Sequence, residues 1–237
     1  MVQVVIGAGD SIVFVVILAV GAFIALIAWG NVQRRKRREA LAAWAMQQGL
    51  SFTAERDHGV EDRYPEFKAL RQGSNRYAFN IMQGTWRERG FLGFDYHYET
   101  QSTDSKGNSS THHHQFSAVI VSSDVPLKPL LIRPEGFFDR IGSFFGFDDI
   151  DFESAEFSKR FFVKAEDRRW AYDVIHARTM DFLLSAPRYT IQFDRGHVIA
   201  SDDRTFDPGQ FEAAAGVVHG VLDALPDYVV EQQRARG

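Results

Sequence analysis

The chain has 237 residues, of which 45% are hydrophobic and 24% are charged, and it contains no cysteine. Disulfide bonds, thiolate zinc sites and cysteine nucleophiles are therefore excluded. The net charge of −4 is unevenly spread: the first 40 residues hold five basic and two acidic residues, which leaves 22 basic and 29 acidic residues, a net charge of −7, in residues 41–237. Such an acidic body is a poor partner for nucleic acid, and we expect no nucleic acid partner.

Residues 11–30 form an uninterrupted apolar segment without an ionisable side chain. At about 1.5 Å per helical residue, the segment is long enough to cross a hydrocarbon core of about 30 Å. We predict a transmembrane helix over 11–30, preceded by a short extracytoplasmic N-terminus over 1–10. A cleaved signal sequence is the alternative, but it would carry its basic residues before the apolar segment and a small-residue cleavage site after it. Gly21, Ala25 and Ala28 share one helix face, which would permit self-association.

A run of basic residues follows the apolar segment. It consists of Arg34, Arg35, Lys36, Arg37 and Arg38. Only Asp10 and the α-amino group precede the segment, so the positive-inside rule places the N-terminus outside and the C-terminal domain in the cytoplasm, at the inner (plasma) membrane. The run would also lie against anionic headgroups, and each basic residue near the surface would contribute about 1 kcal/mol of attraction to the membrane. The lipid bilayer is thus the partner that the sequence indicates most directly.

Residues 31–49 are rich in helix formers up to Gly49, which indicates a basic juxtamembrane helix that continues from the anchor and ends at that glycine. Leu41, Trp44 and Ala45 would share one face of this helix. We expect Trp44 to pack on the following domain, and the alternative is a position at the membrane interface.

An antiparallel meander is predicted after two short strand candidates at residues 50–54 and 66–70. Hydrophobic and polar side chains alternate in three successive runs. The hydrophobic members are Tyr77, Phe79 and Ile81; Leu92, Phe94, Tyr96 and Tyr98; and Phe116, Ala118 and Ile120. The polar turn 87–90 and the loop 103–110, rich in Gly, Asn and Ser, separate the runs. One face of the sheet would be aromatic and buried, and the other polar.

Prolines and phenylalanines mark the middle of the chain. Pro126 and Pro129 would break the chain before a short strand over 130–133. The phenylalanine-rich stretch 135–147 is interpreted as a helical turn that covers the end of the core. A hydrophobic loop resting on the membrane is the alternative.

Two helices and a hairpin complete the prediction. A helix is expected over about 168–185, followed by a hairpin that turns at Arg195 and Gly196. The last helix has Asp207 as its N-cap and Pro208 at its first position. Its apolar stripe is formed by Phe211, Ala214, Ala215, Val218, Leu222 and Leu225.

These elements together predict one cytoplasmic α+β domain over 50–230, in which helices pack on one face of a mainly antiparallel sheet. The roughly 200 residues that follow the anchor are enough for one domain with a sizeable core. A disordered tail over 231–237 would end the chain.

The polar face of the meander gathers Asp95, His97 and Glu99. Adjacent strand residues point to opposite faces, so only His113 of the histidine triplet 112–114 would share that face if the aromatic runs pair face to face. We interpret these residues as a solvated cluster near the loop tip and assign no metal. A metal site and a pH-responsive patch are the alternatives.

The acidic stretch 148–156 has the charge density of a calcium loop but lacks the central glycine and the twelfth-position glutamate of an EF-hand. We interpret it as a solvated edge anchored by Ile150, Phe152 and Phe157. Signatures of serine nucleophiles and of phosphate-binding glycine loops do not occur in the sequence. No catalytic residue and no cofactor is therefore assigned.

Four parts of the chain carry a resemblance to a known group of proteins. They are the stretch from Gly84 through residues 94–99 (FDYHYE), residues 131–135 (LIRPE), residues 151–161 (DFESAEFSKRF) and residues 171–175 (AYDVI). The chain resembles a group of bacterial proteins, common in actinobacteria, with an N-terminal membrane segment and one cytoplasmic domain. The likeness covers most of residues 40–200. It implies this organisation and brings no activity or catalytic residue to transfer.

Two functions of different classes remain open. The first is a non-enzymatic binding or scaffolding module for a protein, or for a small apolar ligand held against the aromatic face. The second is a hydrolase-like enzyme that uses the face of Asp95, His97 and Glu99. A concave pocket lined by these three residues would favour the enzyme, and open surface would favour the module.

Overall fold

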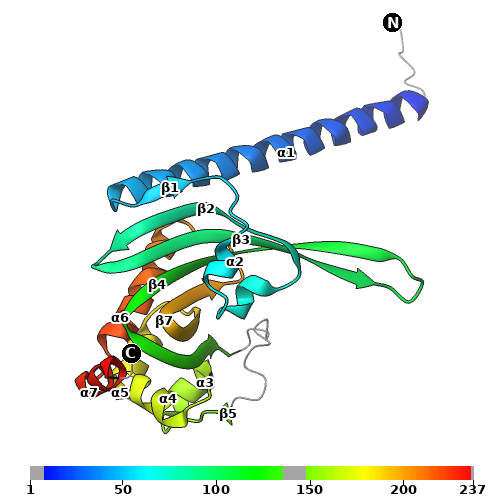
Figure 1. Cartoon of the computed structure of the whole chain (residues 1–237). Coiled ribbons are helices and arrows are strands. Elements are labelled where there is room, and N and C mark those ends of the chain that lie inside the picture. The colour runs from blue at the N-terminus through cyan, green and yellow to red at the C-terminus, as the bar shows by residue number, and fades with distance from the viewer. Residues whose placement is uncertain (1–7, 136–147, 236–237) are drawn as a thin grey trace, which may run out of the picture. The chain divides into compact units, whose positions relative to one another are not determined.

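The structure is a computed structural model that describes residues 8–135 and 148–235 (Figure 1). It divides into two compact units, Met1–Ala40 and Leu41–Gly237. Most of the predicted N-terminal segment 1–10 lies outside the described residues, and so does the phenylalanine-rich stretch apart from Glu135.

The first unit consists mainly of residues 8–40 of helix α1 (Ala8–Gln47), which runs without a break. Large apolar side chains on all its sides are exposed, among them Phe23, Leu26 and Trp29. Within the part of the chain that the structure describes, α1 is the one unbroken helix long and apolar enough to cross a membrane. Because its part before the basic run has no polar face to show to water, this N-terminal helix has the character of a membrane anchor.

The last turns of α1 belong to the second unit. Leu41, Trp44 and Ala45 are buried in its core. The Trp44 ring lies edge-on to Phe91, with ring centroids 6.1 Å apart, which confirms the expected packing on the domain. Gly49 follows the helix with a φ of +72°, a conformation that glycine adopts at little cost.

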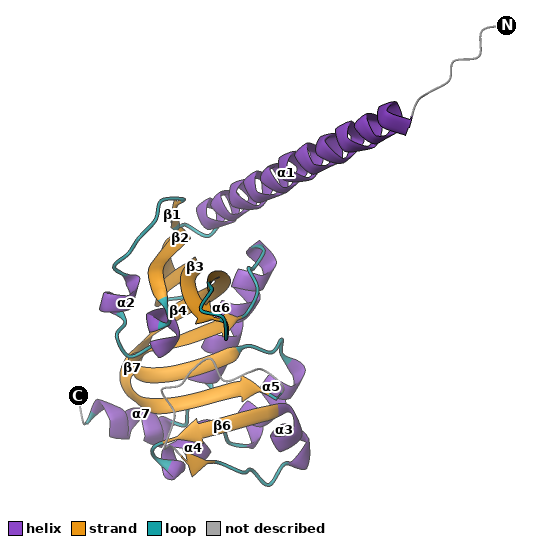
Figure 2. Cartoon of the chain, turned by 90° about the vertical axis from the view of Figure 1, so that its right-hand side faces the viewer, coloured by secondary structure: helices purple, strands orange, loops and turns teal. Residues whose placement is uncertain are grey.

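The second unit is built on an antiparallel sheet of seven described strands (Figure 2). These are β1 (Ser51–Thr53), β2 (Ser74–Trp86), β3 (Arg89–Thr103), β4 (Ser109–Pro134), β5 (Asp148–Asp149), β6 (Phe161–Ala165) and β7 (Thr190–Asp202). The order is β1-β2-β3-β4-β6-β5, and β7 pairs with β4. β2, β3 and the first half of β4 form the predicted meander, and β1 lies within the strand predicted over 50–54.

Strand β4 is the centre of the sheet. Its residues 117–121 lie between β3 and β7, whereas residues 130–132 lie between β7 and β6. The predicted break at Pro126 and Pro129 is therefore wrong. Both prolines lie where the β4–β7 register shifts, so their missing N–H groups interrupt the ladder without ending the strand.

Strand β7 corrects a second prediction. Arg195 has a φ of +51°, yet the chain continues as one strand to Asp202 instead of turning back as a hairpin. Arg195 pairs with Leu127, between the two register shifts of β4. The left-handed residue is therefore part of an irregularity within the strand.

The aromatic face of the sheet is buried as the alternation predicts. Its members in β3 and β4 belong to one core cluster with Val60, Phe67 and Leu70. Those three residues come from the segment that contains α2 (Val60–Arg63) and the 3₁₀ helix η1 (Lys68–Arg71). The strand predicted over 66–70 is wrong, because a 3₁₀ turn places Phe67 and Leu70 on the same side.

The first hydrophobic run of the meander is the exception. Ala78 and Ile81 join the aromatic cluster, whereas Met82 lies in the cluster on the other face of the sheet and Tyr77 stacks on His97. Asn80, with a φ of +49°, lies in a register shift between β2 and β3 and changes the face of the following residues. The predicted sharing of one face by Tyr77 and Ile81 is therefore wrong.

Helices cover the other face of the sheet. They are α3 (Ala155–Arg160), α4 (Arg168–Val174), α5 (Ala177–Ser185), α6 (Pro208–Asp223) and α7 (Asp227–Arg234). The apolar stripe of α6 is buried as predicted, and Asp207 and Gln210 form a capping box at its start. The helix predicted over 168–185 is two helices, and α7 replaces most of the predicted disordered tail. The result is the expected α+β fold.

Candidate functional site

A two-stranded arm extends from the sheet (Figure 1). It comprises residues 100–112: the end of β3, a turn and the start of β4. The last β2–β3 pair is Ser74 with Glu99, and the last β4–β7 pair is Ser117 with Asp202. Among the described residues, the arm strands therefore pair only with each other. Every side chain from Gln101 to His112 is exposed.

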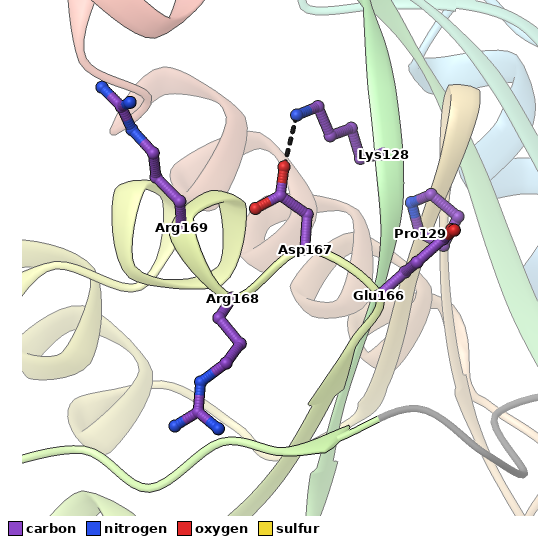
Figure 3. Close-up of a pocket in the computed structure, with 6 residues that line it drawn as sticks. All are labelled: Lys128, Pro129, Glu166, Asp167, Arg168 and Arg169. Atoms are coloured by element: carbon purple, nitrogen blue, oxygen red, sulfur yellow. Dashed lines mark hydrogen bonds and ion pairs between the residues drawn. The ribbon is translucent and has the colours of Figure 1, made fainter.

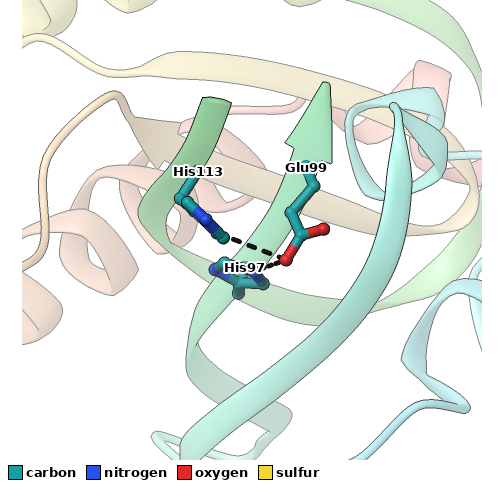
Figure 4. Close-up of side chains that lie close together, drawn as sticks. All are labelled: His97, Glu99 and His113. Atoms are coloured by element: carbon teal, nitrogen blue, oxygen red, sulfur yellow. Dashed lines mark hydrogen bonds and ion pairs between the residues drawn. The ribbon is translucent and has the colours of Figure 1, made fainter. Parts of the chain in front are cut away.

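The base of the arm holds His97, Glu99 and His113 (Figure 4). His113 pairs with Glu99 across β3 and β4. His97 Nε2 lies 3.4 Å and His113 Nδ1 lies 3.2 Å from Glu99 Oε1. One potential ligand atom from each of the three residues lies within 4.8 Å of the other two. The side chains are 6%, 19% and 64% exposed in the order His97, Glu99, His113.

Neighbouring residues hold two members of this cluster in place. The Tyr77 ring stacks on His97 with centroids 4.6 Å apart. Asn75 Nδ2 donates to Glu99 Oε1 at 2.6 Å, and this hydrogen bond is the main cause of a lowered pKa for Glu99, to which both histidines add. Asn75 has a φ of +48°, so a residue that tolerates the left-handed region supplies the contact. No pattern in the sequence around Asn75 points to Glu99, which lies 24 residues away.

The other two histidines of the triplet point to the opposite face. His112 Nε2 lies 2.9 Å from Ser102 Oγ, and His114 Nε2 lies 2.8 Å from Thr100 Oγ1. The His114 ring stacks on Tyr98 of the aromatic face. The strand alternation placed His113 on one face and His112 and His114 on the other, and the side chains are arranged in this way. His113, however, lies at the base of the arm and not at its tip.

Asp95 does not join the cluster, although it shares the strand face. It is 0% exposed, and its carboxyl group accepts hydrogen bonds from Asn80 Nδ2 at 2.8 Å and Ser117 Oγ at 2.5 Å. Ser117 Oγ accepts in turn from the Phe206 N–H at 2.8 Å. The network ties β2, β3 and β4 to the segment before α6, and it keeps Asp95 out of contact with solvent.

An open hollow of about 540 Å³ lies elsewhere, between the second half of β4 and the start of α4 (Figure 3). Lys128 Nζ lies 2.5 Å from Asp167 Oδ2 there, and this contact is the main cause of a lowered pKa for Asp167. Asp167 also caps α4 by accepting from the Trp170 N–H at 3.1 Å. Lys128 and Asp167 thus have structural roles. Because 39 residues separate them, the sequence did not indicate that they would pair.

The basic run lies on α1 in the first unit. Arg35 Nε lies 2.7 Å from Glu39 Oε1, one helical turn away, and Arg34 Nη2 donates to Asn31 Oδ1 at 2.7 Å. The side chains of Arg34, Arg35, Lys36 and Arg38 are exposed.

A buried histidine at the other end of the sheet makes stability pH-dependent. His219 on α6 is 3% exposed, and Arg89 Nη1 donates to its Nδ1 at 3.2 Å. Burial, followed by the charge of Arg89, lowers the pKa of His219. The unfolded chain therefore binds a proton more readily than the folded protein. We therefore expect the free energy of unfolding to decrease as the pH drops below about 6.5, the pKa of histidine in the unfolded chain, and to be retained above that pH.

We expect the melting temperature of the full chain in detergent to fall between about pH 7.5 and about pH 5.5, and to fall less in the His219→Gln variant, since glutamine keeps an acceptor for Arg89 but does not titrate. Thermal unfolding followed by tryptophan fluorescence measures both slopes. Equal slopes for the two proteins would show that His219 does not contribute.

Comparisons with known proteins give one structural likeness to report. No protein-family model matches the chain, and no curated protein matches it. The crystal structure of the mycobacterial trehalose monomycolate transport factor A, TtfA, matches with a TM-score of 0.61 and 13% identity. The match covers 80% of this chain and 94% of TtfA. At this identity the likeness shows a common fold.

Proposed function

We propose that this protein is a membrane-anchored, non-enzymatic accessory factor that binds a partner protein through the arm and acts in transport at the membrane. The observation that carries the proposal is the arm itself. Its strands 100–103 and 109–112 have no third strand beside them in the described structure. Each edge therefore offers backbone N–H and C=O groups to an added strand.

The chemistry of the arm favours a protein partner over a small apolar ligand. The aromatic side chains that an apolar ligand would need are already covered by Val60, Phe67 and Leu70 of the same chain. The exposed side chains of the arm are polar, from Gln101 and Ser102 on one strand to Ser110 and Thr111 on the other. Such a surface binds through hydrogen bonds, which suits the addition of a strand.

Support for a role in transport comes from the fold alone. TtfA is named as a transport factor for trehalose monomycolate, and nearly its whole chain matches. We extend to this chain only the class of role, an accessory to transport, and leave its cargo open. Asp95, one of the three residues that the enzyme hypothesis needs, is buried in its own network, which also favours a non-enzymatic protein.

The proposal includes the topology expected from the sequence. Helix α1 would cross the inner membrane once, with the N-terminus outside and the second unit in the cytoplasm. The basic run Arg34–Arg38 would lie at the inner surface against anionic headgroups. Self-association through Gly21, Ala25 and Ala28 remains part of the proposal, as these small residues would let two helices approach closely.

Site-specific photo-crosslinking in intact cells tests the arm. A photoreactive amino acid at Gln101 or Thr111, which pair across the arm, is expected to give a discrete adduct with a membrane transport protein. Gln232 on α7 is also exposed and provides a matched control of the same residue type. Adducts at neither arm position, or equal adducts at Gln232, would refute binding by the arm.

A further inference from the structure

We propose that His97, Glu99 and His113 form a binding site for one divalent transition-metal ion, with Zn²⁺ as the best fit, at the base of the arm. His97 and Glu99 come from β3 and His113 comes from β4. The site requires no partner protein and stands independently of the proposed function.

The distances match those of a tetrahedral site. Two ligand atoms bound to zinc at about 2.0–2.1 Å lie about 3.3 Å apart when the angle between them is tetrahedral. The observed separations from Glu99 Oε1 are 3.4 Å to His97 Nε2 and 3.2 Å to His113 Nδ1. One ring nitrogen of each histidine lies within 4.8 Å of a ring nitrogen of the other. Since the His113 side chain is 64% exposed, it can rotate to close this last distance.

A carboxylate and two imidazole nitrogens can together hold a cation. Both ring nitrogens face the same carboxylate oxygen. Each nitrogen can donate an N–H to that oxygen, or it can use its lone pair to bind a metal ion that the carboxylate shares. The hydrogen bond that Asn75 Nδ2 donates to Glu99 Oε1 holds this carboxylate in place beside the two rings.

The donor set selects the class of metal. Two imidazoles and one carboxylate suit zinc and its neighbours, whereas calcium and magnesium prefer oxygen ligands alone. Three protein ligands leave a fourth position for water or for a group from outside the chain. His97 Nδ1 has no partner among the described residues, so stacking on Tyr77 replaces the usual hydrogen bond that fixes a zinc-bound histidine.

A metal ion in this position would join β3 to β4 where the sheet gives way to the arm. Beyond Glu99 the arm loses β2 as a neighbour, and before Ser117 it lacks β7. The ion would therefore stiffen the arm at its base. Amide hydrogen exchange of residues 100–112 should slow when the metal binds.

The test is a titration of the full chain in detergent, purified without a polyhistidine tag and treated with a chelator, with ZnCl₂ alone. Calorimetry should show one saturable equivalent of zinc, and Co²⁺ in its place should give the intense visible absorption of a tetrahedral complex. Glu99→Gln and His113→Ala should each weaken zinc binding at least about tenfold, because each leaves only two of the three ligands.

His112→Ala is the matched control, since His112 is an exposed neighbour of His113 that faces the opposite side of the arm. It should leave zinc affinity unchanged. Because His113 is exposed, its replacement is expected to preserve the fold, which circular dichroism checks. The proposal is overturned if zinc shows no saturable binding, or if the His113→Ala variant binds zinc as tightly as the unchanged protein. It is also overturned if His112→Ala weakens zinc binding as much as His113→Ala does, because that result would indicate general binding by surface histidines.

Discussion

Replacing Gly73 by alanine should destabilise the second unit by about 3 kcal/mol and disturb the base of the arm. Gly73 has a φ of +60°, where an L-residue costs about 1 kcal/mol. An added Cβ would also lie 2.9 Å from the Glu99 carbonyl carbon and closer still to its oxygen. The neighbour is backbone and cannot rotate away, so β3 would have to shift.

The matched control for this prediction is Gly49→Ala. Gly49 has a similar φ of +72°, but an added Cβ would meet no atom within 4 Å. Gly49→Ala should therefore lower the free energy of unfolding by only about 1 kcal/mol, the cost of the left-handed backbone conformation. Chemical unfolding of the full chain in detergent measures both variants. Equal losses would show that close contact with Glu99 does not matter.

The Gly73 variant also bears on the metal site. Glu99 is the ligand whose backbone would move, whereas Gly49 lies in the segment between α1 and β1. Gly73→Ala should consequently weaken zinc binding, and Gly49→Ala should not. The comparison separates displacement of Glu99 from a general loss of stability.

Replacing Asp95 by alanine should destabilise the protein by about 3–4 kcal/mol. The carboxyl group accepts from Asn80 and Ser117, and both donors would lose their acceptor inside the core. A buried donor without an acceptor costs about 1–3 kcal/mol. Ser117 also accepts from the Phe206 N–H, so the loss should reach the segment that leads into α6.

Two further variants make this prediction specific. Asp95→Asn keeps the shape and one acceptor, and it should cost about 1–2 kcal/mol. Asp151→Ala removes an exposed carboxyl group and should change stability by less than about 0.5 kcal/mol. Chemical unfolding measures all three variants. If Asp95→Ala is as mild as Asp151→Ala, the buried network contributes little.

Local patterns correctly predicted the helices and strands whose formation depends only on residues close together in the sequence. The capped helix α6 and the alternating runs of β3 and β4 appear as expected, because caps and side-chain periodicity depend on neighbours in the sequence. The same alternation separated His113 from His112 and His114. A period of two gives the face of a residue once the pairing of the strands is assumed.

The predictions failed where tertiary contacts override a local signal. Pro126 was expected to break the chain and Arg195 to form a turn. Both lie within strands, at irregularities of β4 and β7 that pair with each other. Asn80 moves part of β2 to the other face by a register shift. Whether a strand tolerates a bulge depends on the partner strand. The sequence of the bulged strand alone therefore does not predict the bulge.

An apolar N-terminal helix, a basic run beside it and an acidic α+β domain could be predicted in advance, because length, charge and periodicity are properties of the chain. Which polar residues lie together follows from the folded arrangement. It withdrew Asp95 into the core, placed Asn75 on Glu99 and brought His113 to His97. The physical reason is that strand register sets these contacts, and register depends on pairing between segments far apart in the chain.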